Sequence, residues 1–209
     1  MSSPWENAPV PVEDHIDEVV SPAVRQWGLT GGIPSVKGIL NVEFVAPRTT
    51  ISLVGAHGGA GTTTLSLLTG LEDADHSWPV TFPERANDVL IVARSNVWGL
   101  QAARTAAQEL YAGRVVGVNL LGLVMMADVP GRRLPKELEA LVTHVAGAFP
   151  QVWRIPWVDG WRFGELTRLP SRVERVIDEL TALNNERGAG DGSEHTNHES
   201  FDGVGGSRH

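Results

Sequence analysis

The sequence predicts an α/β protein with a doubly wound, mostly parallel sheet and helices on both faces. Strand and helix patterns alternate four times along the chain, which is typical of a parallel sheet covered by helices. The run 88–94 is almost continuously apolar, as expected for a strand buried on both faces. With 209 residues, the chain is long enough for one domain with a full core.

The elements are predicted from about residue 41 onward. Leu65, Leu68 and Leu71 recur on one side of a helix, and Pro135 opens another. Residues 72–87 are acidic and are predicted to form a loop. The predicted order is strand 42–45, strand 50–54, helix 62–71, strand 88–94, helix 99–111, strand 119–127, helix 135–149, strand 151–155 and helix 165–183.

Three regions follow from composition. Residues 1–40 are rich in proline, glycine and acid, and are predicted to be an irregular arm with one short helix at 21–27. The arm either contacts the domain or a partner, or is a loosely ordered extension. Residues 41–183 form the predicted α/β domain, and the polar, glycine-rich segment 184–209 is predicted to be a disordered tail.

The composition excludes several kinds of chemistry. Cysteine is absent, which excludes disulfides, thiolate metal sites and cysteine nucleophiles. The formal net charge is -8 and no basic stripe occurs, so there is no direct nucleic-acid signature. No secretory signal or membrane-length apolar run is recognisable, so we expect a cytoplasmic protein without a membrane partner.

A glycine-rich turn between a strand and a helix is the main candidate site. Small residues at 58–61 allow backbone N–H groups to turn inward and surround a phosphate, while the following helix points its positive end there. Asp128 follows strand 119–127 at the same predicted edge of the sheet. The candidate ligand-binding residues are His57, Gly58, Gly59, Ala60, Gly61, Thr62, Thr63, Thr64 and Asp128, with Thr63 also the candidate metal ligand.

The turn lacks the lysine of a phosphate-binding P-loop. That pattern ends Gly-Lys-Ser/Thr, whereas this chain has Gly61-Thr62-Thr63. Charge-assisted hydrogen bonds are about twice as strong as neutral ones, and losing one transition-state donor costs roughly 3–4 kcal/mol. Fast hydrolysis of a nucleoside triphosphate is therefore not expected. The structural alternative is a turn that needs glycine only for close packing.

The segment 54–64 resembles the deviant P-loop of the ParA/MinD-type ATPases. In that alignment His57 and Thr62 occupy the positions of the family's two lysines. Segments 88–103, 121–128 and 152–157 are similar to later strands and a helix of the family, so the resemblance covers about residues 50–180. It implies a P-loop NTPase-like fold that binds ATP or ADP with Mg²⁺, with Asp128 where a base-contacting residue is often found.

The chain departs from that family after the first helix. The family places two strands and two switch aspartates in the interval occupied here by residues 72–87. Glu72, Asp73 and Asp75 are present but are predicted to lie in no strand, so no aspartate for magnesium is identified. The pattern is most similar to reduced P-loop-like proteins of unknown function from actinobacterial mobile elements and conjugation clusters.

Other residues leave alternatives open. His57 either contacts phosphate or bonds to backbone. Trp153, Trp157 and Trp161 recur every four residues and either form an exposed aromatic patch or pack against the sheet. The arginines that either gather near the strand ends or pair with local acids are Arg132, Arg133, Arg154 and Arg162.

These observations predict a non-hydrolysing module that binds a nucleotide, a phosphate or a protein partner, with a regulatory role in plasmid, phage or conjugation functions. A protein partner is expected, and the oligomeric state is left open. One alternative is an active ParA/MinD-type ATPase in which Arg94, Arg132 or a partner's basic residue replaces the lysine. Another is a scaffold whose loop is empty.

Overall fold

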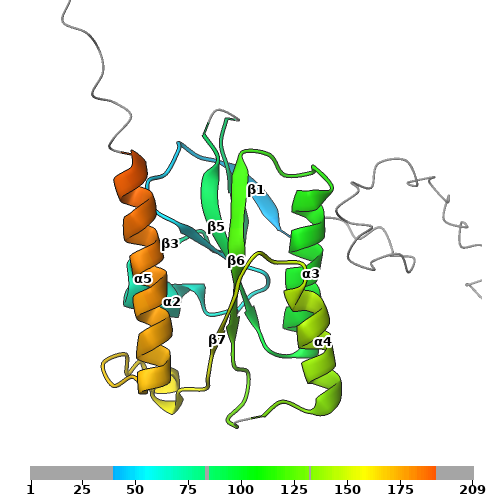
Figure 1. Cartoon of the computed structure of the whole chain (residues 1–209), viewed down its shortest axis with the longest axis vertical. Helices are drawn as coiled ribbons and strands as arrows, with labels where there is room; N and C mark the ends of the chain where they lie inside the picture. Colours follow the sequence, from blue (N-terminus) through cyan, green and yellow to red (C-terminus); the bar gives the residue numbers. More distant parts are fainter. Residues whose placement is uncertain (1–39, 83–84, 132, 192–209) are drawn as a thin grey trace, which may run out of the picture.

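The computed structural model describes residues 40–82, 85–131 and 133–191, which form two parallel sheets and four α-helices (Figure 1). The main sheet has five strands in the order β3-β2-β5-β6-β7, and every neighbouring pair is parallel. Its strands are β2 (Ser52–Gly55), β3 (Glu72–Asp73), β5 (Asn87–Arg94), β6 (Val118–Met126) and β7 (Val152–Ile155). A second, two-stranded parallel sheet pairs β1 (Asn41–Phe44) with β4 (Ser77–Val80).

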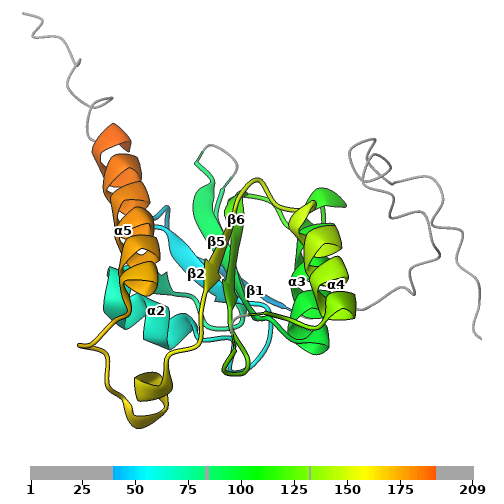
Figure 2. The same cartoon turned by 60° about the horizontal axis from the view of Figure 1, so that its bottom comes forward.

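Helices cover both faces of the main sheet (Figure 2). The helices are α2 (Thr62–Thr69), α3 (Val97–Tyr111), α4 (Lys136–Ala146) and α5 (Ser171–Asp191). Consecutive strand residues alternate between two cores, so that Leu90 and Val92 face α2 and α5 while Val89 and Ile91 face α3 and α4. Because both faces are buried, the strands read as continuous apolar runs.

The predicted α/β class with a parallel sheet is confirmed. The prediction that segment 72–87 is a loop is wrong at two short strands. Glu72 and Asp73 form β3 beside β2, and Ser77–Val80 forms β4. A two-residue strand has no readable period, and Pro79 inside β4 argues against a strand when only the sequence is considered. Pro79 is tolerated because β4 pairs with a single neighbour, β1.

The predicted start and end of the last helix are also wrong. A short 3₁₀-helix, η1 (Asp159–Phe163), precedes α5, and α5 begins at Ser171. The carbonyl of Pro170 accepts from the N–H groups of Val173 and Glu174, so Pro170 stands before the first turn, where its missing N–H costs nothing.

Residues 184–191, which were expected in a disordered tail, continue α5. Asn184 Oδ1 accepts from the N–H of Ile51 at 2.8 Å, and Arg187 pairs with Asp88 at 3.2 Å. These bonds attach the end of α5 to the start of β2 and to β5. The predicted arm with its helix at 21–27 and the remainder of the predicted tail lie outside the described residues.

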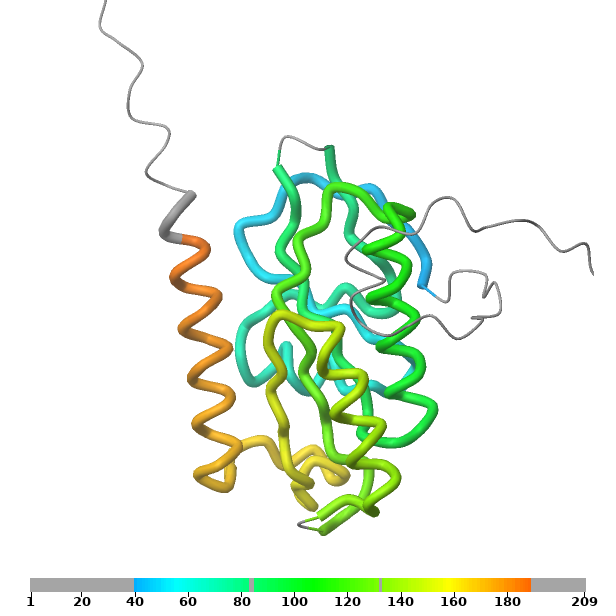
Figure 3. Tube along the Cα trace, turned by 45° about the vertical axis from the view of Figure 1, so that its right-hand side comes forward, coloured from blue at the N-terminus to red at the C-terminus, as the bar shows by residue number. Residues whose placement is uncertain are grey.

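The strand order has a topological switch point at β2. The connection through α2 leads to β3 on one side of β2, whereas β5 lies on its other side. In open parallel sheets, ligands bind in the crevice beyond the carboxyl ends of the strands at such a point. The segments that follow β6 and β7 lie at this same end of the molecule (Figure 3). None of the helices in the described ranges is both long and apolar enough to span a bilayer.

Candidate functional site

The turn between β2 and α2 contains two glycines with positive φ. Gly59 and Gly61 have φ values of 76° and 108°, in the region that favours glycine. A Cβ on Gly61 would lie 3.0 Å from Cε of Met126. The N-cap residue of α2 is Gly61, which provides no side-chain cap. Within the described ranges no other side chain accepts from the first N–H groups of the helix, and such groups can bind an anion.

His57 braces the turn against the end of β5. Its Nε2 accepts from the backbone N–H of Arg94 at 3.1 Å, so Nδ1 carries the proton and donates to the carbonyl of Gly58 at 2.9 Å. Both ring nitrogens are therefore used by backbone groups. Of the two alternatives for His57, the backbone-bonded one is found.

Arg94 lies across the turn. Its Nε donates to the carbonyl of Gly59 at 3.1 Å, and its Nη1 donates to the carbonyl of Ala127 at 3.0 Å. Its Nη2 is 3.8 Å from the position of a Cβ on Gly61. The guanidinium thus brings a positive charge from β5 to the loop that lacks a lysine, and two hydrogen bonds hold it in place.

An aspartate does stand beside Thr63, contrary to the expectation that none would be identified. Thr63 Oγ1 donates to Asp73 Oδ2 at 2.8 Å. The other oxygen of Asp73 accepts from the N–H of Asp75 at 2.9 Å, and the carbonyl of Asp75 accepts from the N–H of Gly55 at 2.7 Å. Asp75 has a φ of 52°. The pairing of β3 with β2 brings the carboxylate of Asp73 to the start of α2.

Two adjoining cavities open at this end of the sheet. The smaller has a volume of about 290 Å³ and is lined by all the predicted loop residues from His57 to Thr64, together with Asp75 and Arg94. The larger, about 460 Å³, extends toward the ends of β6 and β7. They share part of the loop and Arg94, so the phosphate-binding candidate lies next to a space that is large enough for a small ligand.

Asp128 lines the larger cavity. It follows β6, and β5 lies between β6 and β2, the strand that leads into the loop. Its backbone N–H donates to Oγ of the buried Ser95 at 3.2 Å. Trp157 and Trp161 line the same cavity. The indole of Trp157 donates to Asp159 at 2.7 Å, and the guanidinium of Arg162 lies 4.9 Å from the centre of the Trp157 ring. The structure therefore brings Asp128 and the loop residues to one crevice.

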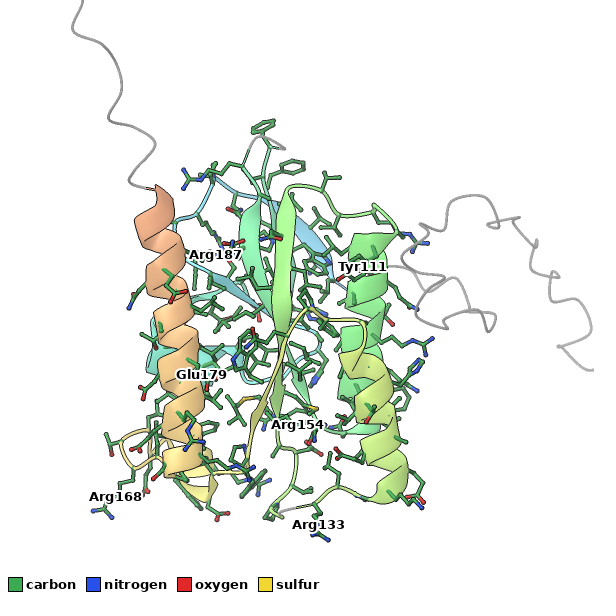
Figure 4. All side chains as sticks on the ribbon, in the orientation of Figure 1. Tyr111, Arg133, Arg154, Arg168, Glu179 and Arg187 are labelled. Carbon is green, nitrogen blue, oxygen red and sulfur yellow. The ribbon has the colours of Figure 1, made fainter. Side chains whose placement is uncertain are left out.

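The three tryptophans do not form one exposed patch. Trp153 is buried in the core between the sheet and α5, whereas Trp157 and Trp161 line the larger cavity. The arginines do not gather either. Arg154 pairs with Glu139 of α4 at 2.7 Å, and Arg133 projects from the loop after β6 (Figure 4). Only Arg162 of this set lines the larger cavity, and Arg132 lies outside the described residues.

Sequence reasoning missed two features of the site. It did not place Asp73 or Asp75 at the loop, because β3 is too short to be recognised. It also did not predict that Arg162 would lie over the ring of Trp157, because that contact depends on the short 3₁₀-helix η1. Within the described part of the chain, no three His, Asp or Glu side chains are grouped closely enough to hold a metal ion by themselves.

The segment that holds the loop and the main sheet matches a protein family. A search of curated proteins finds no relative of this chain. A family model described as a family of unknown function, DUF6668, matches residues 49–177, which span the loop, the main sheet and both cavities. Because this match covers more than half of the chain, the protein belongs to the DUF6668 family.

Proposed function

We propose that this protein binds a nucleotide or a related phosphate compound at the loop 57–64 and uses the bound state as a signal to a protein partner. The observation that carries the proposal is the uncapped start of α2 beneath two glycines with positive φ, with the Arg94 guanidinium across the turn. Backbone N–H groups, a helix N-terminus and a fixed cation are together suited to an anion. The strand order supports the same crevice.

Rapid hydrolysis is not part of the proposal. A P-loop lysine reaches the β- and γ-phosphates, and Thr62 has neither the length nor the charge to do so. Arg94 cannot simply replace it, since two of its nitrogens are used by the carbonyls of Gly59 and Ala127. We therefore expect binding through the backbone, with one positive charge nearby. From the resemblance to ParA/MinD-type ATPases we propose a reduced P-loop protein that still binds its ligand but no longer hydrolyses it rapidly.

The residues around Thr63 fit a magnesium ion shared with bound phosphates. Mg²⁺ prefers oxygen ligands and is usually held by one or two carboxylates, waters and substrate phosphates. Thr63 and Asp73 offer a hydroxyl and a carboxylate joined by a 2.8 Å hydrogen bond. Bound there, the ion would neutralise phosphate charge. Thr63 and Asp73 would orient it, and the backbone N–H groups of α2 would hold the remaining phosphate oxygens.

Exposed aromatic side chains near the crevice support the proposal that a protein partner binds there. Trp98, in the first turn of α3, is 82% exposed, and Phe163, at the end of η1, is 81% exposed. Both belong to segments that also line the larger cavity, through Asn96 and Trp161 respectively. Large exposed aromatic residues are favoured at protein interfaces. A partner that contacts them would sense whether the crevice is filled. The proposed role in plasmid, phage or conjugation functions rests on the resemblance alone.

An active ATPase is the second candidate, and Arg94 favours it because this residue is a cation at the loop. Turnover separates the two candidates. We would measure binding of ADP and ATP, each with Mg²⁺, by calorimetry and thermal shift, and phosphate release by a sensitive colorimetric assay. Binding without release above the background supports the proposed module. Release at the rate of an ordinary ATPase supports the enzyme.

A pair of glycine variants tests where binding occurs. Gly61 and Gly70 stand at opposite ends of α2, both with positive φ. Gly61→Ala places a Cβ inside the loop, whereas a Cβ on Gly70 meets no atom within 4 Å. Both variants strain the backbone, but only Gly61→Ala should abolish binding. If no nucleotide or inorganic phosphate changes the melting temperature of the wild-type protein, the loop is empty and the proposal is wrong.

A further inference from the structure

We propose that an exposed apolar face of β1 is the docking site for the segment that precedes this strand, residues 1–39 of the same chain. The β1 face consists of Val42 and Phe44. It lies away from the crevice, so the inference goes beyond the proposed function and does not depend on it. Three observations carry it: the pairing of β1 with β4, the alternation of side chains along β1, and the place where residues 1–39 join the domain.

The pairing with β4 shows to which side the β1 face points. Val42 pairs with Trp78 and Phe44 pairs with Val80 in a parallel register, and paired residues of neighbouring strands project to the same face of a sheet. Trp78 and Val80 belong to the core that α3 covers, and their exposed fractions are 0% and 2%. Val42 and Phe44 therefore extend a buried face sideways, beyond the part that the helix covers.

This extension is apolar, and it is open among the described residues. Val42 is 54% exposed, Phe44 is 75% exposed, and Phe82, which follows β4, is 72% exposed. The other side of β1 carries the polar Asn41 and Glu43. Such alternation is typical of a strand with one face against a core. Two strands alone are marginally stable, and an open apolar edge tends to pair with other chains, so a cover on this face stabilises the protein.

Residues 1–39 reach the domain at the edge of the β1 face. They end at Leu40, which is 6% exposed and lies in the same core as Trp78. The four residues of β1 span about 13 Å at roughly 3.3 Å per residue, so a small part of the segment is long enough to return along the strand. An attached segment has an effective concentration in the millimolar range. A second copy or a separate partner must exceed that concentration to displace it.

The composition next to β1 suits this role. Residues 31–39 contain one charged side chain, Lys37, and three aliphatic ones, Ile33, Val36 and Ile39. Gly38 permits the sharp turn that is required just before Leu40. The segment therefore offers apolar side chains to an apolar face, with little charge to desolvate.

The β1 face is at the end of the sheet opposite the loop. His76, directly before β4, has its Nδ1 2.7 Å from the carbonyl oxygen of Gly55, where β2 ends. At the other end of β4, the carbonyl of Pro79 accepts from Nδ2 of Asn87, the first residue of β5, at 2.9 Å. β1 runs parallel to β4, so Phe44 lies at this second end (Figure 1). Failure of ligand binding at the loop would leave the inference about β1 untouched.

The first test measures whether the β1 face is covered in the full chain. The sequence has no cysteine, so an introduced thiol is the only one. Val42→Cys is matched by Val129→Cys, because these valines have similar exposed fractions of 54% and 57%. If residues 1–39 cover the face, Val42→Cys should react with Ellman's reagent about tenfold more slowly than Val129→Cys, and equally fast in urea. Equal rates in the native protein overturn the inference.

A cross-link identifies what covers the face. Glu43→Cys would carry a benzophenone label, and trypsin would cut after Arg25, Lys37 and Arg48. The label then stays on peptide 38–48, separate from peptides 1–25 and 26–37. We expect cross-links from 38–48 to one of these two peptides, in protein with the mass of a single chain. Cross-links between two chains, or only to peptides of the described domain, overturn the inference.

A variant that opens the face completes the test. Phe44→Ser, combined with Val42→Cys, should raise the rate of thiol reaction to that of Val129→Cys. Phe163→Ser is the control, since it changes a similarly exposed phenylalanine in η1, and it should leave the rate low. A rate that stays low with Phe44→Ser overturns the inference, because apolar contact with the β1 face then does not protect the thiol. If the double variant does not fold, the comparison of the two single cysteine variants and the cross-link decide.

Discussion

The hydroxyl of Thr63 donates a 2.8 Å hydrogen bond to the carboxylate of Asp73, although the two residues lie before and after most of helix α2. The bond exists because β3 returns beside β2 immediately after the helix. It places a carboxylate at the one position of the loop where a hydroxyl is expected to bind magnesium. Magnesium-dependent ligand binding is therefore the most direct prediction of the proposed function.

Asp73→Asn should remove most of the effect of Mg²⁺ on nucleotide affinity. The amide is a poorer ligand for Mg²⁺, and groups that orient a metal ligand typically contribute about 10–100-fold to metal affinity. Calorimetric titrations of ADP and ATP with and without Mg²⁺ measure the effect. Glu72→Gln is the matched control, since Glu72 is the other residue of β3 and pairs with Arg48 at 3.0 Å instead. An unchanged Mg²⁺ effect in Asp73→Asn would contradict the magnesium site.

Thr62→Lys should strengthen nucleotide binding by restoring the missing charge. Thr62 lines the smaller cavity, so a long side chain can extend into it. A hydrogen bond to a charged group contributes roughly 1.5–3 kcal/mol, which corresponds to about 10–100-fold in affinity. Thr62→Met is the control for length without charge. If the lysine and methionine variants bind the nucleotide equally, the backbone does not place phosphates within reach of position 62.

The long elements of this fold could be predicted from the sequence because their patterns are local. The apolar run of β5 and the glycine-rich turn can each be recognised from a pattern of about ten residues. The relations that make the site are not local. The bond between His57 and the N–H of Arg94 joins residues that are 37 positions apart, and only the strand order brings them together.

Short strands also could not be predicted from the sequence. Glu72 and Asp73 owe their extended conformation to pairing with β2, not to their own propensity, because acidic residues are depleted in strands. The same applies to the end of α5. Asn184 and Arg187 lie in a segment whose composition is typical of a polar tail, and their bonds to Ile51 and Asp88 hold the continued helix against the sheet. Tertiary contacts decided both cases.

Asn184→Ala should destabilise the protein even though the residue lies beyond the predicted domain. The N–H of the fully buried Ile51 would lose its acceptor, and an unsatisfied buried donor costs about 1–3 kcal/mol. For a domain of this size, each kcal/mol lowers the melting temperature by about 2–4 °C. Asn185→Ala, at an exposed neighbouring position of the same helix, should have no such effect. Equal melting temperatures for the two variants would mean that the bond to Ile51 is not important for stability.

Gly99→Ala and Gly147→Ala should shift stability in opposite directions, and only the first should affect the site. A Cβ on Gly99 would lie 2.4 Å from the carbonyl oxygen of Arg94 and 2.9 Å from Nε2 of His57. The start of α3 must then move away from β5, at a cost of roughly 1–3 kcal/mol, and His57 can no longer brace the loop. Nucleotide affinity should fall together with the melting temperature.

Gly147 lies at the end of α4 with φ near -63°, and its nearest atom to a new Cβ is 3.5 Å away. Alanine fits there without strain and should stabilise the protein by about 0.4–1 kcal/mol, since it restricts the unfolded chain. Ligand binding should be unchanged because this helix end contributes nothing to either cavity. A Gly99→Ala variant that loses stability but keeps full affinity would show that the brace from His57 to β5 is not needed for the loop to bind its ligand.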